Sequence, residues 1–115
     1  MQAPLLDGLA VLSELTDDAL LISNLLERPV RGRDRIVRIM TALEAHFDAV
    51  ADVERINAAG HRIIASIALL PSGKKVRMSV FATRNARGWI SEVLLTLDDG
   101  AAMPELAGII NKAAG

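Results

Sequence analysis

The sequence contains no cysteine and no tyrosine, and phenylalanine and tryptophan together make up only 3% of it. The missing cysteine excludes disulfide bonds, thiolate metal ligands and a cysteine nucleophile. Because aromatic rings are so few, the core has to be aliphatic, built from leucine, isoleucine, valine, alanine and methionine. A formal net charge of −1 supplies no overall field that would attract nucleic acid or an anionic membrane, and we expect neither as a partner.

Long hydrophobic runs are missing too. The longest one, Ile63 to Leu70 interrupted by Ser66, is too short to span a bilayer. The first four residues lack the basic start of a signal peptide, so we expect a cytoplasmic protein. A length of 115 residues fits one domain covering residues 1–115. The mean hydropathy of +0.32 is high for a small soluble chain. We expect apolar surface that the core of one monomer does not bury to be covered by a second subunit.

The segment 28–36 organises the predicted fold, because an apolar run stops there and an amphipathic helix begins. Pro29 cannot donate to a sheet ladder and ends the segment 19–27, which periodicity alone leaves open between helix and strand. The length of that segment and the proline favour a strand. Gly32 permits the turn, and apolar residues three or four apart predict a helix over residues 34–47.

Two more helices are predicted near the ends of the chain. Leucines at helical spacing place one over residues 5–15, ended by Thr16-Asp17-Asp18. Pro104 and Glu105 open another, expected to run to Lys112. The apolar face of this last helix consists of Leu106, Ile109 and Ile110. We expect it to pack on the body of the domain, in its own subunit or in a partner.

Strands are predicted between these helices, over residues 50–58, 61–70, 75–83 and 89–97. The first is charged, as edge strands often are, and the three later strands form an antiparallel meander because their turns are short. Strict alternation in the last strand puts Ile90, Glu92, Leu94 and Thr96 on one face and Trp89, Val93, Leu95 and Leu97 on the other. The strand 61–70 is apolar on nearly both faces, so both faces of the sheet are expected to be covered, one by helices and one by a second subunit.

The order of these elements, with "RPVRGRDRI" leading into a helix and "RNARGWISEV" at the last turn, resembles the nuclear transport factor 2-like superfamily, and within it the SnoaL-like proteins. The resemblance covers roughly residues 19–98. It implies a single SnoaL-like α+β domain, a cone in which a curved antiparallel sheet wraps a long helix (a cystatin-like roll) and encloses a pocket. It also implies homodimers through the outer face of the sheet. Family members usually open with two helices, whereas there is room for one here, so we expect a shortened N-terminal helical part.

The enzymatic residues of this superfamily are not found in the sequence. Steroid isomerases of the superfamily use a carboxylate base shortly before the Pro-x-x-Gly turn, together with a tyrosine and an acidic hydrogen-bond donor. The corresponding positions hold Ser23 or Asn24 and Val80, and tyrosine is missing. The Asp-Arg-Asp set of the epoxide hydrolases cannot be placed. We expect no cofactor, and no metal site either, because the two histidines are not at a metal-ligand spacing.

Eight residues are candidates for lining the implied pocket. They are Ser23, Asn24, Met40, His46, Met78, Val80, Glu92 and Leu94. His46 is a general base if it faces the pocket, or else a residue that caps the end of its helix. Glu92 is an acid or base if it is partly buried, or else pairs with a cross-strand cation such as Arg77. Ser23 and Asn24 either orient a polar ligand atom, or one of them simply faces outward from the strand.

Two further features have a functional and a structural interpretation. Five arginines between residues 28 and 38 either hold a phosphate or carboxylate at the helix start or form a solvated face with local ion pairs. His61, just after a turn, is a weaker candidate for a functional histidine than His46.

Three functions remain open. The prediction we adopt is a dimeric protein that binds a small hydrophobic molecule in a mostly apolar pocket. The first alternative is an isomerase, cyclase or hydrolase that uses a pocket glutamate or histidine. The second is a purely structural dimerisation module, in which Met40, Met78 and Leu94 fill the pocket.

Overall fold

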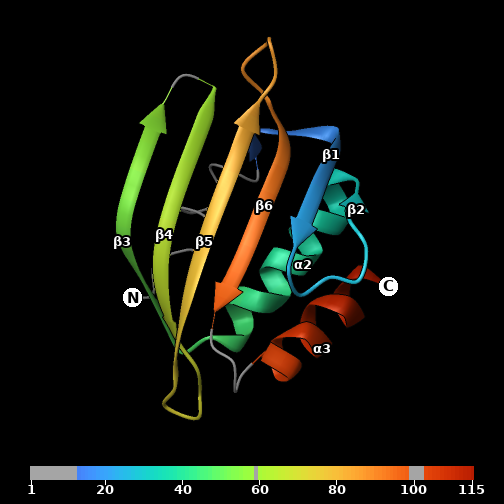
Figure 1. The fold of residues 1–115 in the computed structure, drawn as a ribbon. Helices are drawn as coiled ribbons and strands as arrows, with labels where there is room; N and C mark the ends of the chain where they lie inside the picture. Colours follow the sequence, from blue (N-terminus) through green and yellow to red (C-terminus); the bar gives the residue numbers. More distant parts are fainter. Residues whose placement is uncertain (1–12, 59, 99–102) are drawn as a thin grey trace.

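A computed structural model describes residues 13–58, 60–98 and 103–115, which form one six-stranded sheet and two helices (Figure 1). The strands are β1 (Leu15–Ser23), β2 (Val30–Arg31), β3 (Ala49–Ala58), β4 (His61–Leu69), β5 (Lys75–Arg84) and β6 (Ile90–Asp98), and the helices are α2 (Arg33–His46) and α3 (Met103–Ala114). The order across the sheet is β2-β1-β6-β5-β4-β3. Only the β1–β6 pair is parallel in this described part. The helix predicted over residues 5–15 falls almost wholly outside the described residues.

The sheet is curved, and both helices lie on the same side of it (Figure 1). We call that side the inner face and the opposite side the outer face. β3 through β6 form a continuous antiparallel meander, and β3 is an edge strand, as its charged sequence predicted. The limits of β3, β4, β5 and β6 lie within one residue of the predicted ones. This arrangement confirms the predicted α+β fold with a curved sheet around a long helix.

The first strand was predicted with the wrong limits. β1 begins at Leu15 instead of residue 19 and ends at Ser23 instead of residue 27, so Thr16, Asp17 and Asp18 belong to the strand rather than ending a helix. The pairing with β6 shifts register between Leu15 and Leu20. Such a bulge lets the chain carry exposed aspartates and still return Ala19 and Leu21 to the core.

A second irregularity changes the face on which Ile90 lies. Thr83 pairs with Glu92, but the next residue of β5, Arg84, pairs with Ile90, so Ser91 is the extra residue of a bulge. Ile90 is therefore fully buried on the same side as Val93. The strict alternation that grouped Ile90 with Glu92 and Leu94 is wrong at this position.

α2 follows the prediction closely. Gly32 precedes it with a φ of 117°, a conformation that disfavours any residue with a Cβ, and its N–H donates to the Ala19 carbonyl at 2.9 Å. This bond fixes the start of the helix against β1. The buried face of α2 consists of Ile36, Ile39, Met40 and Leu43.

α3 packs on α2 within its own subunit and runs two residues beyond Lys112. Leu106 and Ile110 are completely buried, and Asn111 donates from Nδ2 to the Leu25 carbonyl at 2.8 Å. The expectation that this helix closes the body of the domain is confirmed. None of the helices in the described ranges is long and apolar enough to cross a bilayer. The cytoplasmic location stays a prediction.

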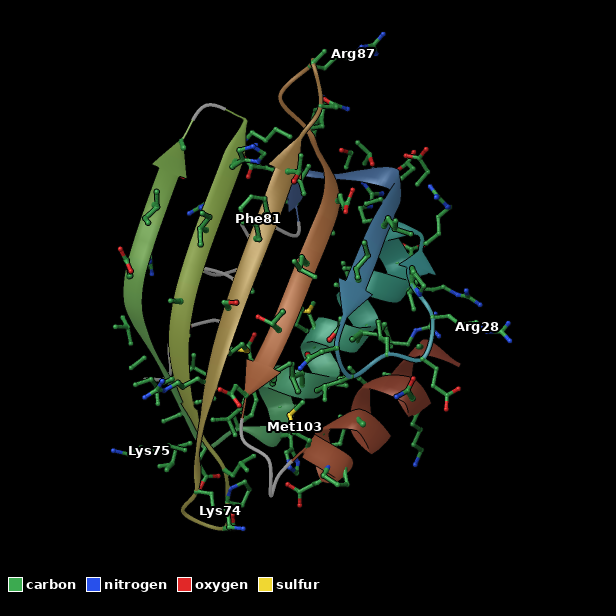
Figure 2. All side chains as sticks on the ribbon, viewed as in Figure 1. Arg28, Lys74, Lys75, Phe81, Arg87 and Met103 are labelled. Carbon is green, nitrogen blue, oxygen red and sulfur yellow. The ribbon has the colours of Figure 1, made fainter. Side chains whose placement is uncertain are left out.

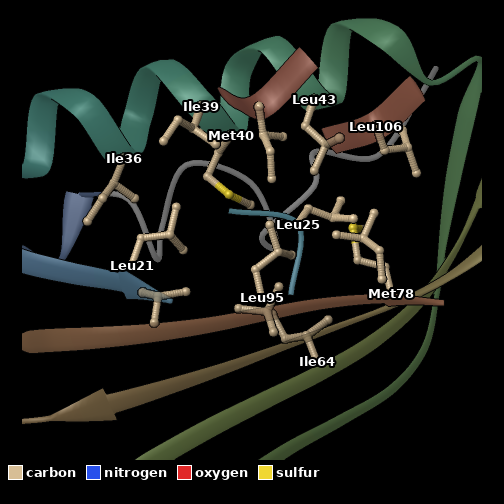
Figure 3. Packing of buried hydrophobic residues seen from close by; sticks show 14 of the residues in the cluster. Leu21, Leu25, Ile36, Ile39, Met40, Leu43, Ile64, Met78, Leu95 and Leu106 are labelled. Atoms are coloured by element: carbon tan, nitrogen blue, oxygen red, sulfur yellow. The ribbon is translucent and has the colours of Figure 1, made fainter. Parts of the chain in front are cut away.

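The space between the helices and the inner face is occupied by large aliphatic side chains (Figure 3). Met40 and Leu43 of α2 point towards the sheet, Leu21, Ile64 and Leu95 point from the sheet towards the helices, and each of the five is at most 1% exposed. Dense packing of this kind makes the inner face the hydrophobic core of the domain.

Candidate functional site

The eight candidate residues do not converge on one site. Met40, Met78 and Val80 are buried at 1–3% exposure in the core between α2 and the inner face. Glu92 and Leu94 are exposed and lie on the outer face of β6, on the far side of the sheet. The remaining three, Ser23, Asn24 and His46, lie at the ends of elements. Strand alternation therefore separates residues that the resemblance grouped around one pocket.

Ser23 and Asn24 organise the end of β1. The Ser23 hydroxyl accepts a hydrogen bond from the N–H of Leu25 at 3.2 Å, which turns the chain after the strand. The Asn24 amide forms a matched pair of hydrogen bonds with Leu97 of β6, donating from Nδ2 to its carbonyl at 2.8 Å and accepting from its N–H at 3.2 Å. The Asn24 side chain thus extends the hydrogen bonding between β1 and β6 beyond the end of β1.

The two histidines lie far from this turn. His46 ends α2, and its Nε2 lies 3.1 Å from Oε2 of Glu105 in the first turn of α3, so it links the two helices. His61 lies on the outer face, where its ring is 4.9 Å from that of Phe81. The imidazole Nδ1 of His61 is buried and has no hydrogen-bond partner among the described residues.

The arginine-rich segment lies at the start of α2, around a hollow of about 250 Å³. Arg33 forms an ion pair with Asp17 at 3.4 Å, and Arg31 donates to the Asp18 carbonyl at 3.1 Å. Both partners lie on β1, and Arg28 points away from the domain (Figure 2). Local pairing on the surface accounts for two of the five arginines, in line with the structural interpretation of this segment.

The outer face carries a line of apolar side chains that crosses five strands. Cross-strand pairing places them in the order Ile22 (β1), Leu94 (β6), Phe81 (β5), Ile63 (β4) and Ile56 (β3). We call this set the apolar row. Ile56 and Leu94 are 41% and 39% exposed, and Phe81 projects from β5 towards the viewer in Figure 2, away from the helices. Across the described ranges, no element covers this row.

Beside the apolar row, towards the turn between β4 and β5, the outer face is hollowed. This outer hollow has a volume of about 410 Å³. Its lining consists of Val53 from β3, Ala65, Ser66 and Ile67 from β4, Arg77, Met78 and Ser79 from β5, and Thr96 and Asp98 from β6. Of the eight candidate residues, only Met78 contributes to it. Sequence reasoning missed this site because it looked for a pocket on the inner face.

The lining of the outer hollow divides into an apolar half and a polar half. Val53, Ala65 and Ile67 supply apolar surface from β3 and β4. The other half comes from β5 and β6, where the hydroxyls of Ser79 and Thr96 form a hydrogen bond. Nearer the β4–β5 turn, Arg77 of β5 lies opposite Asp98 of β6 in the register of the two strands. The register between β3 and β4 shifts between Asp52 and Glu54, and this bulge sets Val53 outward at 64% exposure.

Comparison with known proteins identifies the class of fold. The sequence matches no protein-family model, and it matches no curated protein. Its structure is similar to a cystatin-like protein from Silicibacter pomeroyi, with a TM-score of 0.78 and 12% identity over 89% of this chain and 72% of that one. It is also similar to a steroid delta-isomerase from Pseudomonas aeruginosa, with a TM-score of 0.76 and 13% identity over 90% of this chain and 76% of that one.

A third similar structure is a SnoaL-like polyketide cyclase from a Jannaschia species, with a TM-score of 0.65 and 19% identity over 88% of this chain and 80% of that one. At such identities the likeness establishes the fold. The chain has the cystatin-like α+β fold shared by nuclear transport factor 2-like and SnoaL-like proteins, which confirms the resemblance seen in the sequence.

Proposed function

We propose that the protein is a homodimeric binding module. Two copies pack through their outer faces, and the outer hollow holds a small hydrophobic molecule. The observation that carries the proposal is the apolar row, an apolar stripe across five strands on a face that no described element covers.

Free energy supports a partner on this face. Burying a large aliphatic or aromatic side chain is worth about 1.5–3 kcal/mol, and the row leaves Ile56 and Leu94 well exposed. A second copy is the simplest partner, because a two-fold interface uses the same patch on both subunits and an apolar row can face its own copy. The flanking charges also have both signs, with Glu92 beyond one side of the row and the oppositely charged Arg77 and Asp98 beyond the other. Such a face is able to complement itself.

The ligand part of the proposal is supported by the outer hollow. Its volume of about 410 Å³ falls in the range of small-molecule sites, and half of its lining is apolar with a few polar groups at one side. The hollow lies on the same face as the apolar row but nearer the β4–β5 turn. Dimerisation through the row would place it at the border of the interface, where a partner reduces its exposure to water.

The structural-module alternative is favoured by a different observation, the filled core. Met40 and Met78 occupy the space in which a pocket was expected, although Leu94 lies on the outer face and takes no part. Under this alternative the dimer forms and the outer hollow binds nothing. The enzyme alternative needs Glu92 or His46 in the expected pocket, but Glu92 is exposed on the outer face and His46 forms a hydrogen bond with Glu105.

Sedimentation equilibrium with a pair of variants tests the dimer. At micromolar concentration the wild-type protein should have about twice the monomer mass of 12.3 kDa. The Phe81→Asp variant should be monomeric, because it puts a charge at the centre of the apolar row. Ala86→Asp, at the exposed tip of the β5–β6 turn, is the matched control and should stay dimeric. A wild-type protein that remains monomeric on concentration would contradict the proposal.

A further inference from the structure

The polar half of the outer hollow presents one positive and one negative side chain side by side. Arg77 on β5 is the cross-strand partner of Asp98 on β6, and both line the hollow. Neither side chain forms a hydrogen bond or ion pair with another described residue. Their charged ends are therefore available to a ligand.

The charges and the apolar surface lie at opposite sides of the hollow. Arg77 and Asp98 come from β5 and β6, whereas Val53, Ala65 and Ile67 come from β3 and β4. The hydroxyls of Ser79 and Thr96 lie on the same two strands and form the next cross-strand pair on this face. A matching ligand is amphipathic, with a polar end over β5 and β6 and an apolar body over β4 and β3.

The two adjacent charges restrict what the polar end can be. A simple carboxylate would gain from Arg77 but be repelled by Asp98, and a simple amine would meet the opposite conflict. A group with a carboxylate and an ammonium on the same carbon atom satisfies both side chains at once. The geometry also fits. The guanidinium of Arg77 is able to bind the ligand's carboxylate in a bidentate manner, and the carboxylate of Asp98 is able to accept hydrogen bonds from the ligand's ammonium.

We propose that the outer hollow binds a free amino acid with a hydrophobic side chain. Its carboxylate contacts Arg77, its ammonium contacts Asp98, and its side chain covers Ala65 and Ile67. This inference rests on the proposed function, because it names the chemical class of the small hydrophobic molecule. It also gives the hydroxyl pair of Ser79 and Thr96 a role as additional donors or acceptors for the polar end.

A series of four related probes tests the inference by NMR titration of the ¹⁵N-labelled full chain. Leucine carries both charges, 4-methylpentanoate lacks the ammonium, isopentylamine lacks the carboxylate, and 4-methylpentanamide carries no charge. Leucine should shift the amide resonances of the outer hollow and bind about five-fold more tightly than each of the other three. That factor is modest because exposed ion pairs are weak.

Three variants separate the charges from the fold. Arg77→Gln and Asp98→Asn should each weaken leucine binding about five-fold. Asp98→Asn should also bind 4-methylpentanoate more tightly than the wild type does, a gain that simple structural damage would not produce. Lys75→Gln is the matched control, because it removes an exposed charge of β5 outside the lining and should leave leucine binding unchanged.

The outcomes distinguish this inference from the proposed function on which it rests. If 4-methylpentanamide binds in the outer hollow as tightly as leucine, the amino acid is the wrong class, although the hollow is still a site for apolar molecules. If none of the four probes shifts the resonances of the hollow at millimolar concentration, both the inference and the ligand part of the proposed function are wrong. If Asp98→Asn fails to improve carboxylate binding, the assigned role of Asp98 is overturned.

Discussion

The inner and outer faces of the sheet are formed by the same strands but differ in burial and composition. On the inner face, alternate residues such as Ile64 and Leu95 are completely buried under α2 and α3. On the outer face, the intervening residues combine an apolar row with charged and hydroxyl side chains, and several remain well exposed. The difference shows that the inner face holds the fold together, whereas the outer face leaves apolar side chains exposed and is the surface on which we propose that other molecules bind.

The largest expected effect follows from removing α3, which closes the inner face. A chain that lacks residues 103–115 loses the burial of Leu106 and Ile110, worth about 3–6 kcal/mol for two large side chains, and exposes part of α2. We expect a much lower melting temperature and aggregation, measured by circular dichroism and light scattering. A truncated protein that melts like the full chain would mean that α3 is an appendage.

A matched pair of leucine variants compares the two faces directly. Leu43→Ala on the inner face should lower the free energy of unfolding by about 2–5 kcal/mol, since it leaves a cavity in a closed core. Leu94→Ala on the outer face should lower it by less than about 1 kcal/mol. Both are measured by urea denaturation in the Phe81→Asp background, where dimerisation does not contribute. Equal losses would remove the distinction between the faces.

The Asn24 side chain should contribute less than a core leucine. Asn24→Ala removes two hydrogen bonds to the backbone of Leu97, leaves those groups partly unsatisfied, and should lower the free energy of unfolding by about 1–3 kcal/mol. Asn57→Ala, on the exposed edge strand β3, is the control and should change it by no more than about 0.5 kcal/mol. If the two variants unfold alike, Asn24 does not join β1 to β6.

The smallest expected effect is a catalytic one. With a β,γ-unsaturated 3-ketosteroid as substrate, we expect no isomerisation above the rate in buffer. Proton transfer needs a positioned base and an oxyanion donor, but Ser23 is engaged in its own turn and Val80 is a core residue. Turnover well above buffer would show that the base and donor positions were assigned to the wrong residues.

The sequence predicted the elements whose ends carry strong local signals. Turns at Pro71–Lys74 and Asn85–Gly88 set the limits of β4, β5 and β6, and Pro29 with Gly32 marks the entry to α2. β1 was misjudged because its two exposed aspartates interrupt the apolar pattern at a bulge. Ile90 was assigned to the wrong face for a similar reason, since alternation fails at a bulge that only the pairing with β5 reveals.

The candidate site was less predictable than the fold. The resemblance placed a pocket between helix and sheet, but the long aliphatic side chains of α2 fill that space, which depends on packing rather than on pattern. The outer hollow combines Val53, set outward by a bulge, with Asp98, forty-five positions later in the chain. The lining of the hollow comes from four strands. Which of their residues lie side by side depends on the register between the strands, and no local stretch of sequence specifies that register.

The most direct test of the account is whether the apolar row of one copy touches that of another. A mixed sample, with half of the chains labelled ¹³C at isoleucine and leucine methyl groups and half unlabelled, allows intermolecular nuclear Overhauser effects to be measured. The account predicts such signals at the methyl groups of Ile56, Ile63 and Leu94, and their loss in Phe81→Asp. Intermolecular signals that arise only elsewhere, or none at concentrations where the protein is dimeric, would contradict it.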